Sequence, residues 1–228
     1  MKIRNWIVGA LMCVSSPLMA SAAPEEGQIV KGWHTYDAMG CMLLQECKDG
    51  VKRVTKIQEL QEKFPEYNWG IVGFEFEEMV KALEAVGSHV HLAPPKYFPR
   101  GHRGVYHTVS NHFYMNEAYV YRPAIFMAVL RHEGWHAAQD CMAGTIKNNL
   151  IAIIHPEEDV PTLYQDIVKN AYSNQPEAIP WEKEAYWAGH TEAMTLKALK
   201  SCASNTPMWE TYPPTPLTSK WLEENGYK

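Results

Sequence analysis

Two histidines and a glutamate in the middle of the chain have the types and the spacing that metal chemistry requires. His132 and His136 are four residues apart, and Glu133 directly follows the first of them, in the pattern HExxH. On a helix, residues four apart lie on one face with about 6 Å between their Cβ atoms, so both imidazoles could bind one metal ion. Glu133 would stand about 100° further round the helix, close enough to hold a metal-bound water without being a ligand. This arrangement suits hydrolysis.

The surrounding sequence predicts the helix that these residues need. Pro123 suits a first helical turn, apolar residues recur at helical spacing from Ile125 onward, and Gly144 follows the expected end. His132 and His136 continue the apolar stripe, which would point them into the core. Two buried imidazoles without partners would be costly, and a metal ion removes that cost. The pattern therefore favours a metal-binding helix over a purely structural one.

A catalytic zinc usually has three protein ligands and a water, so HExxH needs a ligand from elsewhere in the chain. Gln139, three residues after the second histidine, excludes the extended motif HExxHxxGxxH. Glu182 and Glu184 are the best candidates, because they are acids in the first turns of a helix predicted to open near Pro180. The small Ala185 would allow that helix to pack closely.

The two motifs together resemble the gluzincin group of zincin metallopeptidases, in which a glutamate from a later helix joins HExxH. HExxHxxQ followed by Pro-x-Glu-x-Glu-Ala is similar to the compact, exported bacterial members, over residues 104–188. The resemblance implies an α+β, zincin-like fold, mainly helical, with a small sheet next to the HExxH helix. It implies Zn²⁺ bound by His132, His136 and Glu182, with Glu184 as the alternative third ligand. Glu133 would be the general base in peptide-bond hydrolysis.

Two further roles have candidates in the same part of the chain. Donors to a tetrahedral oxyanion could come from Tyr164, Tyr172, Tyr186 or His190.

The gluzincin group often has an acid four residues after its third ligand, hydrogen-bonded to a ligand histidine, but Tyr186 stands at that position here. Asp140, one helical turn after the second histidine, is an alternative acceptor.

A different class of function is also compatible with these motifs. The alternative is an exported, disulfide-stapled zinc-binding or interaction protein without catalytic activity. Glu133 favours the enzyme, because a structural metal site has no use for a carboxylate beside the water.

Composition limits the range of partners. The 228 residues are 46% hydrophobic and 21% charged, which indicates an ordinary globular domain. The formal net charge is -5 and no basic block is present, so a nucleic-acid partner is not expected. The expected partner is a peptide or protein substrate.

The first residues predict export. Lys2 and Arg4 precede a short apolar run over residues 6–14, and Ala20-Ser21-Ala22 offers a cleavage site. We therefore expect a signal peptide over 1–22, a single metallopeptidase domain over 23–228, and a periplasmic or secreted location. No later stretch is long and apolar enough to span a bilayer, so no stable membrane insertion is expected after removal of the signal.

Four cysteines remain in the expected exported domain, and an even number predicts two disulfides. Cys41 and Cys47 could not pair with each other if they ended a straight strand, since they would be about 20 Å apart. If they flank a loop, that pairing is easy. The partners of Cys141 and Cys202 therefore stay open.

The remaining pattern predicts several elements around the HExxH helix. Helices are expected from Thr55 to about Phe64, over 74–86, from about 159, and from about 180 towards Cys202. Residues 89–92 alternate as a strand, and the strand-like stretch 104–116 could offer an open edge to an extended peptide. His102, His107 and His112 in and before that stretch are interpreted as surface or groove histidines rather than further ligands.

Overall fold

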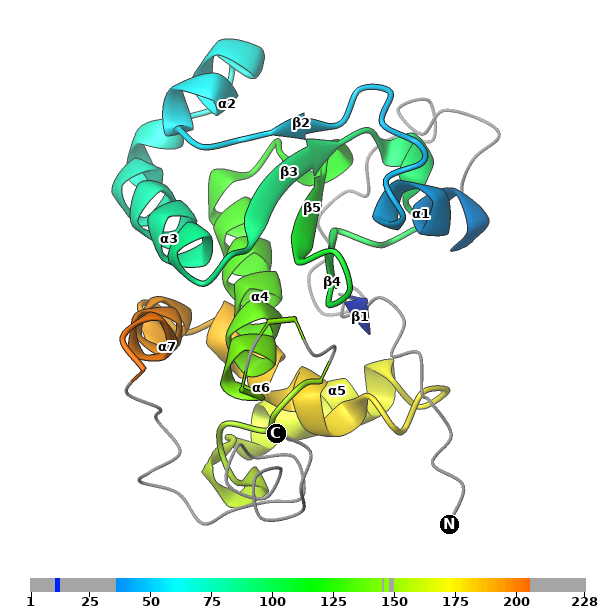
Figure 1. Cartoon of the computed structure of the whole chain (residues 1–228), viewed down its shortest axis with the longest axis vertical. Coiled ribbons are helices and arrows are strands. Elements are labelled where there is room, and N and C mark those ends of the chain that lie inside the picture. The colour runs from blue at the N-terminus through cyan, green and yellow to red at the C-terminus, as the bar shows by residue number, and fades with distance from the viewer. Residues whose placement is uncertain (1–10, 13–35, 145, 148–149, 206–228) are drawn as a thin grey trace.

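The predicted α+β class is confirmed. The computed structural model describes residues 11–12, 36–144, 146–147 and 150–205. These residues form a mainly helical structure in which a small sheet lies beside the long helix α4, Pro123–Met142 (Figure 1). The predicted signal peptide falls outside the described residues except for Leu11–Met12.

The described strands form one sheet in the order β1-β4-β5-β3-β2. Their bounds are Leu11–Met12 for β1, Lys52–Arg53 for β2, His89–Ala93 for β3, Gly104–His107 for β4 and His112–Asn116 for β5. β3 and β5 are parallel, and the other pairs are antiparallel. The single strand expected over 104–116 was wrong, because a turn divides it into β4 and β5. Asn111 adopts a φ of 58° in this turn, and the short polar side chain of asparagine tolerates that left-handed conformation.

The two faces of the sheet pack differently because side chains alternate along each strand. Phe113 and Met115 of β5 belong to the main core, which also contains the buried side chains of α4. Tyr114, between them, faces a smaller core that includes Met42 of helix α1, Tyr36–Leu43, and Phe98. The sheet is thus covered by α4 on one face and only partly by α1 on the other (Figure 1).

The remaining helices surround α4. Their bounds are Ile57–Lys63 for α2, Gly73–Ala85 for α3, Thr162–Ala171 for α5, Ile179–Gly189 for α6 and Met194–Ala203 for α7. α3 and α7 lie on one side of α4, while α5 and α6 cross its lower end (Figure 1). No helix in the described part of the chain is long and apolar enough to cross a membrane.

Most expected helices are confirmed within a few residues, but one was wrong. The helix expected to run from about 180 towards Cys202 is broken between α6 and α7, where Ala193 adopts a φ of 62°. The break follows Gly189, at which an added Cβ would lie 3.0 Å from the carbonyl oxygen of Ala128. The lack of a side chain at Gly189 allows the end of α6 to lie close to α4. The chain then turns, and α7 packs against α3 and α4.

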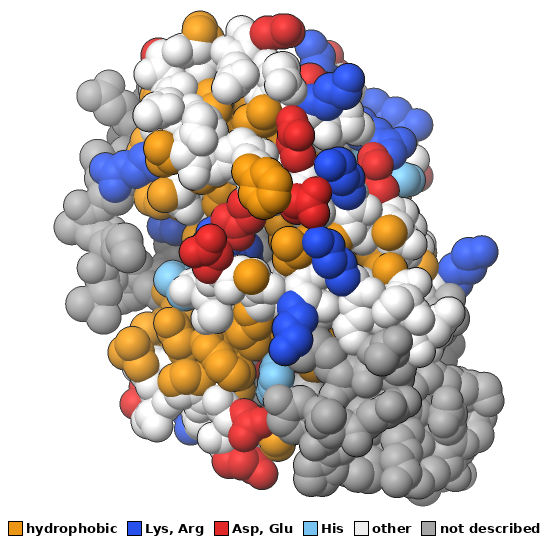
Figure 2. Space-filling model, turned by 90° about the vertical axis from the view of Figure 1, so that its left-hand side faces the viewer, with side chains coloured by type: hydrophobic (Ala, Val, Ile, Leu, Met, Phe, Trp, Pro, Cys, Tyr) orange, Lys and Arg blue, Asp and Glu red, His pale blue; other side chains and the backbone are white. Residues whose placement is uncertain are grey.

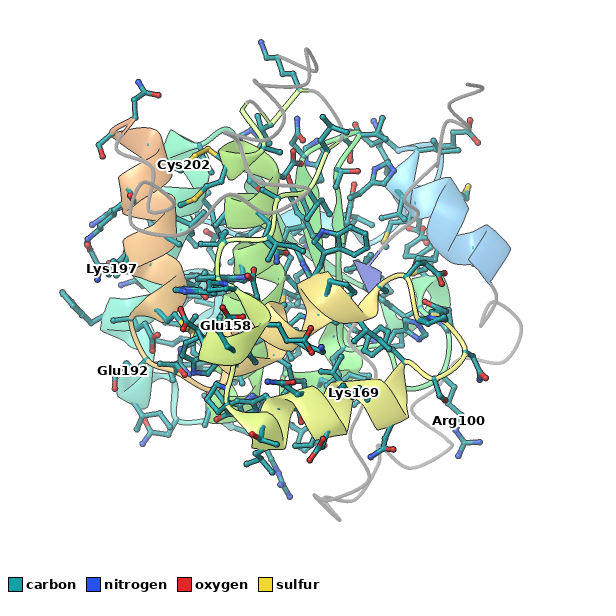
Figure 3. The ribbon with its side chains drawn as sticks, turned by 90° about the horizontal axis from the view of Figure 1, so that it is seen from below. Arg100, Glu158, Lys169, Glu192, Lys197 and Cys202 are labelled. Atoms are coloured by element: carbon teal, nitrogen blue, oxygen red, sulfur yellow. A yellow bond between two sulfur atoms is a disulfide. The ribbon has the colours of Figure 1, made fainter. Side chains whose placement is uncertain are left out.

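Charged side chains cover the outside of these helices. Figure 2 shows acidic and basic side chains interspersed on the side of the molecule that carries α3 and α7. Glu78 of α3 is paired with both Lys81 and Lys200 there. Seen from below, Glu192 and Lys197 lie at the rim (Figure 3). The electrostatic field over this face therefore has no uniform sign.

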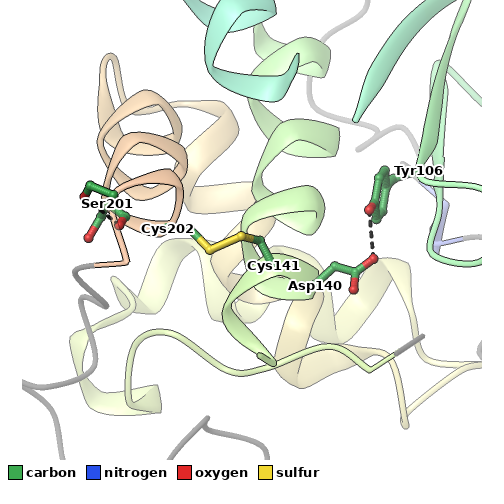
Figure 4. The surroundings of a disulfide bond; sticks show 6 residues. Tyr106, Asp140, Cys141, Ser201 and Cys202 are labelled. Carbon is green, nitrogen blue, oxygen red and sulfur yellow. Dashed lines mark hydrogen bonds between the residues drawn. A yellow bond between two sulfur atoms is a disulfide. The ribbon is translucent and has the colours of Figure 1, made fainter. Parts of the chain in front are cut away.

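Two disulfides are formed, as expected. Cys41 and Cys47 close the turn that ends α1, with their Cα atoms 5.3 Å apart, so this stretch is not a straight strand. Cys141 in the last turn of α4 is bonded to Cys202 of α7, with Cα atoms 6.4 Å apart (Figure 4). The second bond ties α7 to the helix that carries HExxH.

Removing the two disulfides is expected to have unequal effects on stability. The separations are 61 residues for Cys141–Cys202 and 6 for Cys41–Cys47, and a longer closed loop restricts the unfolded chain more. Replacing Cys141 and Cys202 with serine should lower the free energy of unfolding by about 4 kcal/mol, against about 2 kcal/mol for the same replacement of Cys41 and Cys47. Urea unfolding of the two double variants measures this difference. Equal losses would contradict it.

Candidate metal centre

Helices α4 and α6 bring three metal-binding side chains together. His132 and His136 lie one turn apart on the buried face of α4, with ring centroids 5.0 Å apart. Glu182 in the first turn of α6 places Oε2 3.2 Å from His132 Nε2 and Oε1 3.6 Å from His136 Nε2. One ligand atom from each residue lies within 4.8 Å of the others. This group could therefore hold a metal ion.

The same atoms are buried without well-aligned hydrogen bonds. Nε2 of His132 and Nε2 of His136 are shielded from solvent and make no hydrogen bond. The carboxylate oxygens of Glu182 are shielded too and make no well-aligned hydrogen bond, although the Tyr172 hydroxyl stabilises the charged form of this carboxylate. Buried polar atoms are normally satisfied, because an unpaired one costs several kcal/mol. A cation between the three side chains would satisfy all of them. The types of these atoms and their lack of other partners therefore fit a bound metal ion.

Close packing of α6 on α4 creates this geometry. Ala185 and Ala188 are completely buried between the helices, as their small size suggested. At Gly189 an added Cβ would come within 3.2 Å of His132 Cβ, so no larger residue fits there without displacing the ligand helix. Small side chains on α6 therefore bring its first turn, and Glu182, to the two histidines.

Glu184 has a different role. Its carboxylate accepts hydrogen bonds from Trp135 Nε1 at 3.1 Å, from Gln139 Nε2 at 2.7 Å and from the backbone N–H of Ile154 at 3.2 Å. The backbone N–H of His155 donates to it as well. The Glu184 carboxylate is buried and is not among the groups that converge with the imidazoles of His132 and His136. The structure thus brings Glu182, and not the alternative Glu184, to the histidines.

Gln139 orients one of the ligands. Nδ1 of His136 lies 2.8 Å from Gln139 Oε1, and Gln139 Nε2 donates in turn to Glu184. An amide oxygen can only accept, so Nδ1 carries the proton and Nε2 is left free for a metal. The spacing of three residues between His136 and Gln139 on a helix is the signal in the sequence that indicates this contact.

Asp140 does not take the role that was considered for it. Its Oδ2 accepts a hydrogen bond from the hydroxyl of Tyr106 at 2.8 Å, which joins α4 to β4 (Figure 4). Burial raises the pKa of Asp140 to about 8, and the Tyr106 hydrogen bond acts in the opposite direction. Asp140 therefore fixes the sheet against the ligand helix, while Gln139 holds the imidazole.

Glu133 stands beside the centre with both carboxylate oxygens unpaired. It is completely buried, and neither oxygen has a hydrogen-bond partner. Burial, followed by the negative charge of Glu182, raises its pKa well above the usual value for a glutamic acid. A bound cation would act against this shift, because positive charge favours the carboxylate.

The histidines are in the form that binds metals. Burial lowers the pKa of His132 to about 3 and that of His136 to about 4, so both are neutral at pH 7. Burial raises the pKa of Glu182 to about 7, although His136 and the Tyr172 hydroxyl act in the opposite direction. Neutral imidazoles are the metal-binding form, and metal binding favours an ionised Glu182.

Three of the four candidate oxyanion donors form an aromatic group next to the centre. The ring of Tyr186 lies 6.5 Å from that of His132 and 4.6 Å from that of His190. Tyr164 of α5 lies 6.0 Å from Tyr186 and 5.8 Å from His190. The fourth, Tyr172, acts on Glu182 instead.

A glycine on β4 keeps space for Glu133. An added Cβ at Gly104 would lie 2.9 Å from Val129 Cγ1 and 3.2 Å from Glu133 Oε1. Gly104→Ala is therefore expected to displace Glu133 and to lower the free energy of unfolding by about 1–3 kcal/mol, the usual effect of overpacking. Thermal unfolding and a crystal structure of the variant would check both effects. An unchanged Glu133 with unchanged stability would contradict them.

Comparisons with known protein families, with curated proteins and with solved structures give no match for this chain. The chemistry of this centre therefore follows from its own residues. Two imidazoles and one carboxylate are a donor set of catalytic zinc sites, which leave a coordination position for water.

Proposed function

We propose that this protein is an exported, zinc-dependent metallopeptidase with a zincin-like active site. The observation that carries the proposal is the buried convergence of His132, His136 and Glu182 with an unpaired Glu133 beside them. Imidazole and carboxylate ligands suit zinc, although other divalent ions can use them. A free carboxylate next to the centre favours hydrolysis over a structural metal site.

The chain's own residues have distinct parts in the proposed reaction. A zinc ion held by the three ligands would lower the pKa of water and polarise the carbonyl of the scissile bond. Glu133 takes the proton from the attacking water and passes it to the leaving amine. Its oxygens make no well-aligned hydrogen bond with the protein, and the backbone N–H of Tyr106 on β4 is the protein donor that acts on the carboxylate, which leaves room for a water. Gln139 keeps the His136 imidazole in the required orientation.

The edge of the sheet supports a peptide as the substrate. β4 begins at Gly104, where an added Cβ would lie 3.2 Å from Glu133 Oε1, and its outer edge accepts an extended strand. In the structure that strand is β1, in which Leu11 pairs with Tyr106 and Met12 with Val105. An extended substrate could add to the same edge through backbone hydrogen bonds. Removal of the proposed signal peptide, which contains β1, would free this edge.

Two observations support export. The described part of the chain forms two disulfides, which are typical of proteins outside the cytoplasm. The sequence of residues 1–22 has the order of charges, apolar residues and small residues of a signal peptide. We therefore propose a periplasmic or secreted location.

A peptide-library digest tests the proposed activity. The protein comprising residues 23–228, loaded with zinc and with its disulfides intact, is incubated with the library, and the products are sequenced by mass spectrometry. We expect cleavage that a chelator abolishes and that added zinc restores. Full zinc occupancy without cleavage of any peptide or protein would overturn the peptidase and leave a zinc-binding or interaction protein.

A further inference from the structure

The face of the sheet that points away from α4 carries a row of histidines. His112 of β5 is paired in register with His107 of β4 on one side and with His89 of β3 on the other. Residues paired across neighbouring strands project to the same face, so these three side chains form a row. His91 lies two residues after His89 on β3 and therefore projects to the same face.

The rings of this row are as close to one another as those of the buried centre. The ring centroid of His112 lies 4.7 Å from that of His91 and 5.7 Å from that of His89. These two distances bracket the 5.0 Å between His132 and His136. A single ion bound to two imidazole nitrogens at about 2.1 Å from each would accommodate such spacings.

Several ring nitrogens of the row are available. Nδ1 of His89 and Nδ1 of His112 are buried without a hydrogen-bond partner. Nδ1 of His91 lies 3.2 Å from the carbonyl oxygen of His89, so it carries the proton and leaves Nε2 free. All three side chains are partly exposed, but Nδ1 of His89 and Nδ1 of His112 are shielded from solvent, so an ion reaches these two nitrogens only after the imidazoles rotate.

The electrostatic surroundings keep these imidazoles neutral. Burial, with His112 as the next cause, lowers the pKa of His91 to about 4, and burial also lowers the pKa of His89 and His112. The guanidinium of Arg53 acts on all three imidazoles and the ammonium of Lys48 acts on His112. Arg53 lies 2.6 Å from Glu84, and this pairing limits its repulsion of a cation. Neutral imidazole is the form that binds metals.

We infer that His89, His91 and His112 form a second metal site, which takes a divalent transition ion with a preference for imidazole. Copper, nickel and zinc ions have that preference. Among the described residues, only the buried group has three ligand atoms within 4.8 Å of one another, so the imidazoles of the row must rotate to bind an ion together. The second site is therefore weaker than the buried centre, and the sheet separates the two. It is independent of the proposed peptidase activity.

Copper(II) titration of the protein loaded with one equivalent of zinc, which fills the stronger buried centre first, tests this inference. Binding is followed by electron paramagnetic resonance, which reports nitrogen ligands, and retained zinc is measured by elemental analysis. We expect copper bound through nitrogen while zinc is retained. His112→Asn should weaken copper binding at least about tenfold, since loss of a direct ligand costs more than loss of an outer partner. His91→Asn should do the same, and circular dichroism checks that both variants fold.

Glu182→Ala is the matched control, because it removes a ligand of the buried centre and leaves the row intact. Copper binding to the row should persist in this variant. Unchanged copper affinity in both His112→Asn and His91→Asn would overturn the second site, and so would copper uptake only as zinc is lost. Failure of the peptide-library digest would overturn the proposed function and leave the second site untouched.

Discussion

Glu133→Gln is expected to lower the rate of peptide cleavage by about 10²- to 10⁴-fold, the usual contribution of a general base. Glutamine has nearly the same shape, but its amide cannot accept the proton of the attacking water. Glu133 is not among the three residues whose ligand atoms converge, so zinc affinity should change little. Cleavage rates at saturating zinc, together with zinc content, measure the two effects separately.

The control for this variant is Glu177→Gln, which makes the same chemical change at an exposed position before α6. It should keep the wild-type rate. A Glu133→Gln protein that cleaves peptides at the wild-type rate would remove Glu133 from the mechanism. One that loses zinc would make Glu133 a ligand.

Glu182→Ala is expected to weaken zinc binding by at least about 100-fold, more than the loss of an outer-shell partner usually costs. Glu184→Ala should weaken it only about tenfold, because Glu184 acts on His136 through Gln139. The second variant should instead lower the free energy of unfolding by about 3 kcal/mol, since it leaves buried donors of Trp135, Gln139 and the backbone without an acceptor.

Zinc affinity from competition with a chelator and urea unfolding of the metal-free proteins give the two quantities. Both variants are compared at a temperature at which each is folded. The reverse order of zinc affinities would make Glu184 the third ligand and contradict the structure.

Local sequence patterns were sufficient for the helix that carries HExxH. Its apolar repeat, the proline at its start and the glycine after its end are all short-range signals, and α4 spans Pro123–Met142 accordingly. The same pattern placed His132 and His136 on the buried face. The pair of histidines that could bind a metal ion was therefore predictable without any knowledge of the fold.

Features that depend on tertiary packing were not predictable from local patterns. Gly189, the last residue of α6, is a local stop signal, but Ala193 adopts a left-handed conformation for which alanine has no preference, so the turn into α7 was not predictable. The choice between Glu182 and Glu184 depended on how α6 docks, and the partner of His136 depended on the rotamer of Gln139. The pairing of Cys41 with Cys47 required the turn after α1.

The histidine row shows the same limit. The alternation of His89 and His91 predicted a strand, and His112 fell in a second strand-like stretch. Only the parallel pairing of β3 with β5 brings His89 beside His112, and those strands are separated by β4 in the sequence. Order along the chain does not determine which strands become neighbours.

Titration of zinc into the metal-free protein, with the rate of peptide cleavage as the readout, tests the proposed metal centre most directly. The rate should rise with added zinc and level off at about one ion per chain, as expected for a single catalytic site. The Glu133→Gln protein should bind the same tight equivalent without gaining activity. Zinc binding at His132, His136 and Glu182 with no cleavage at any zinc concentration would contradict a catalytic role for this centre.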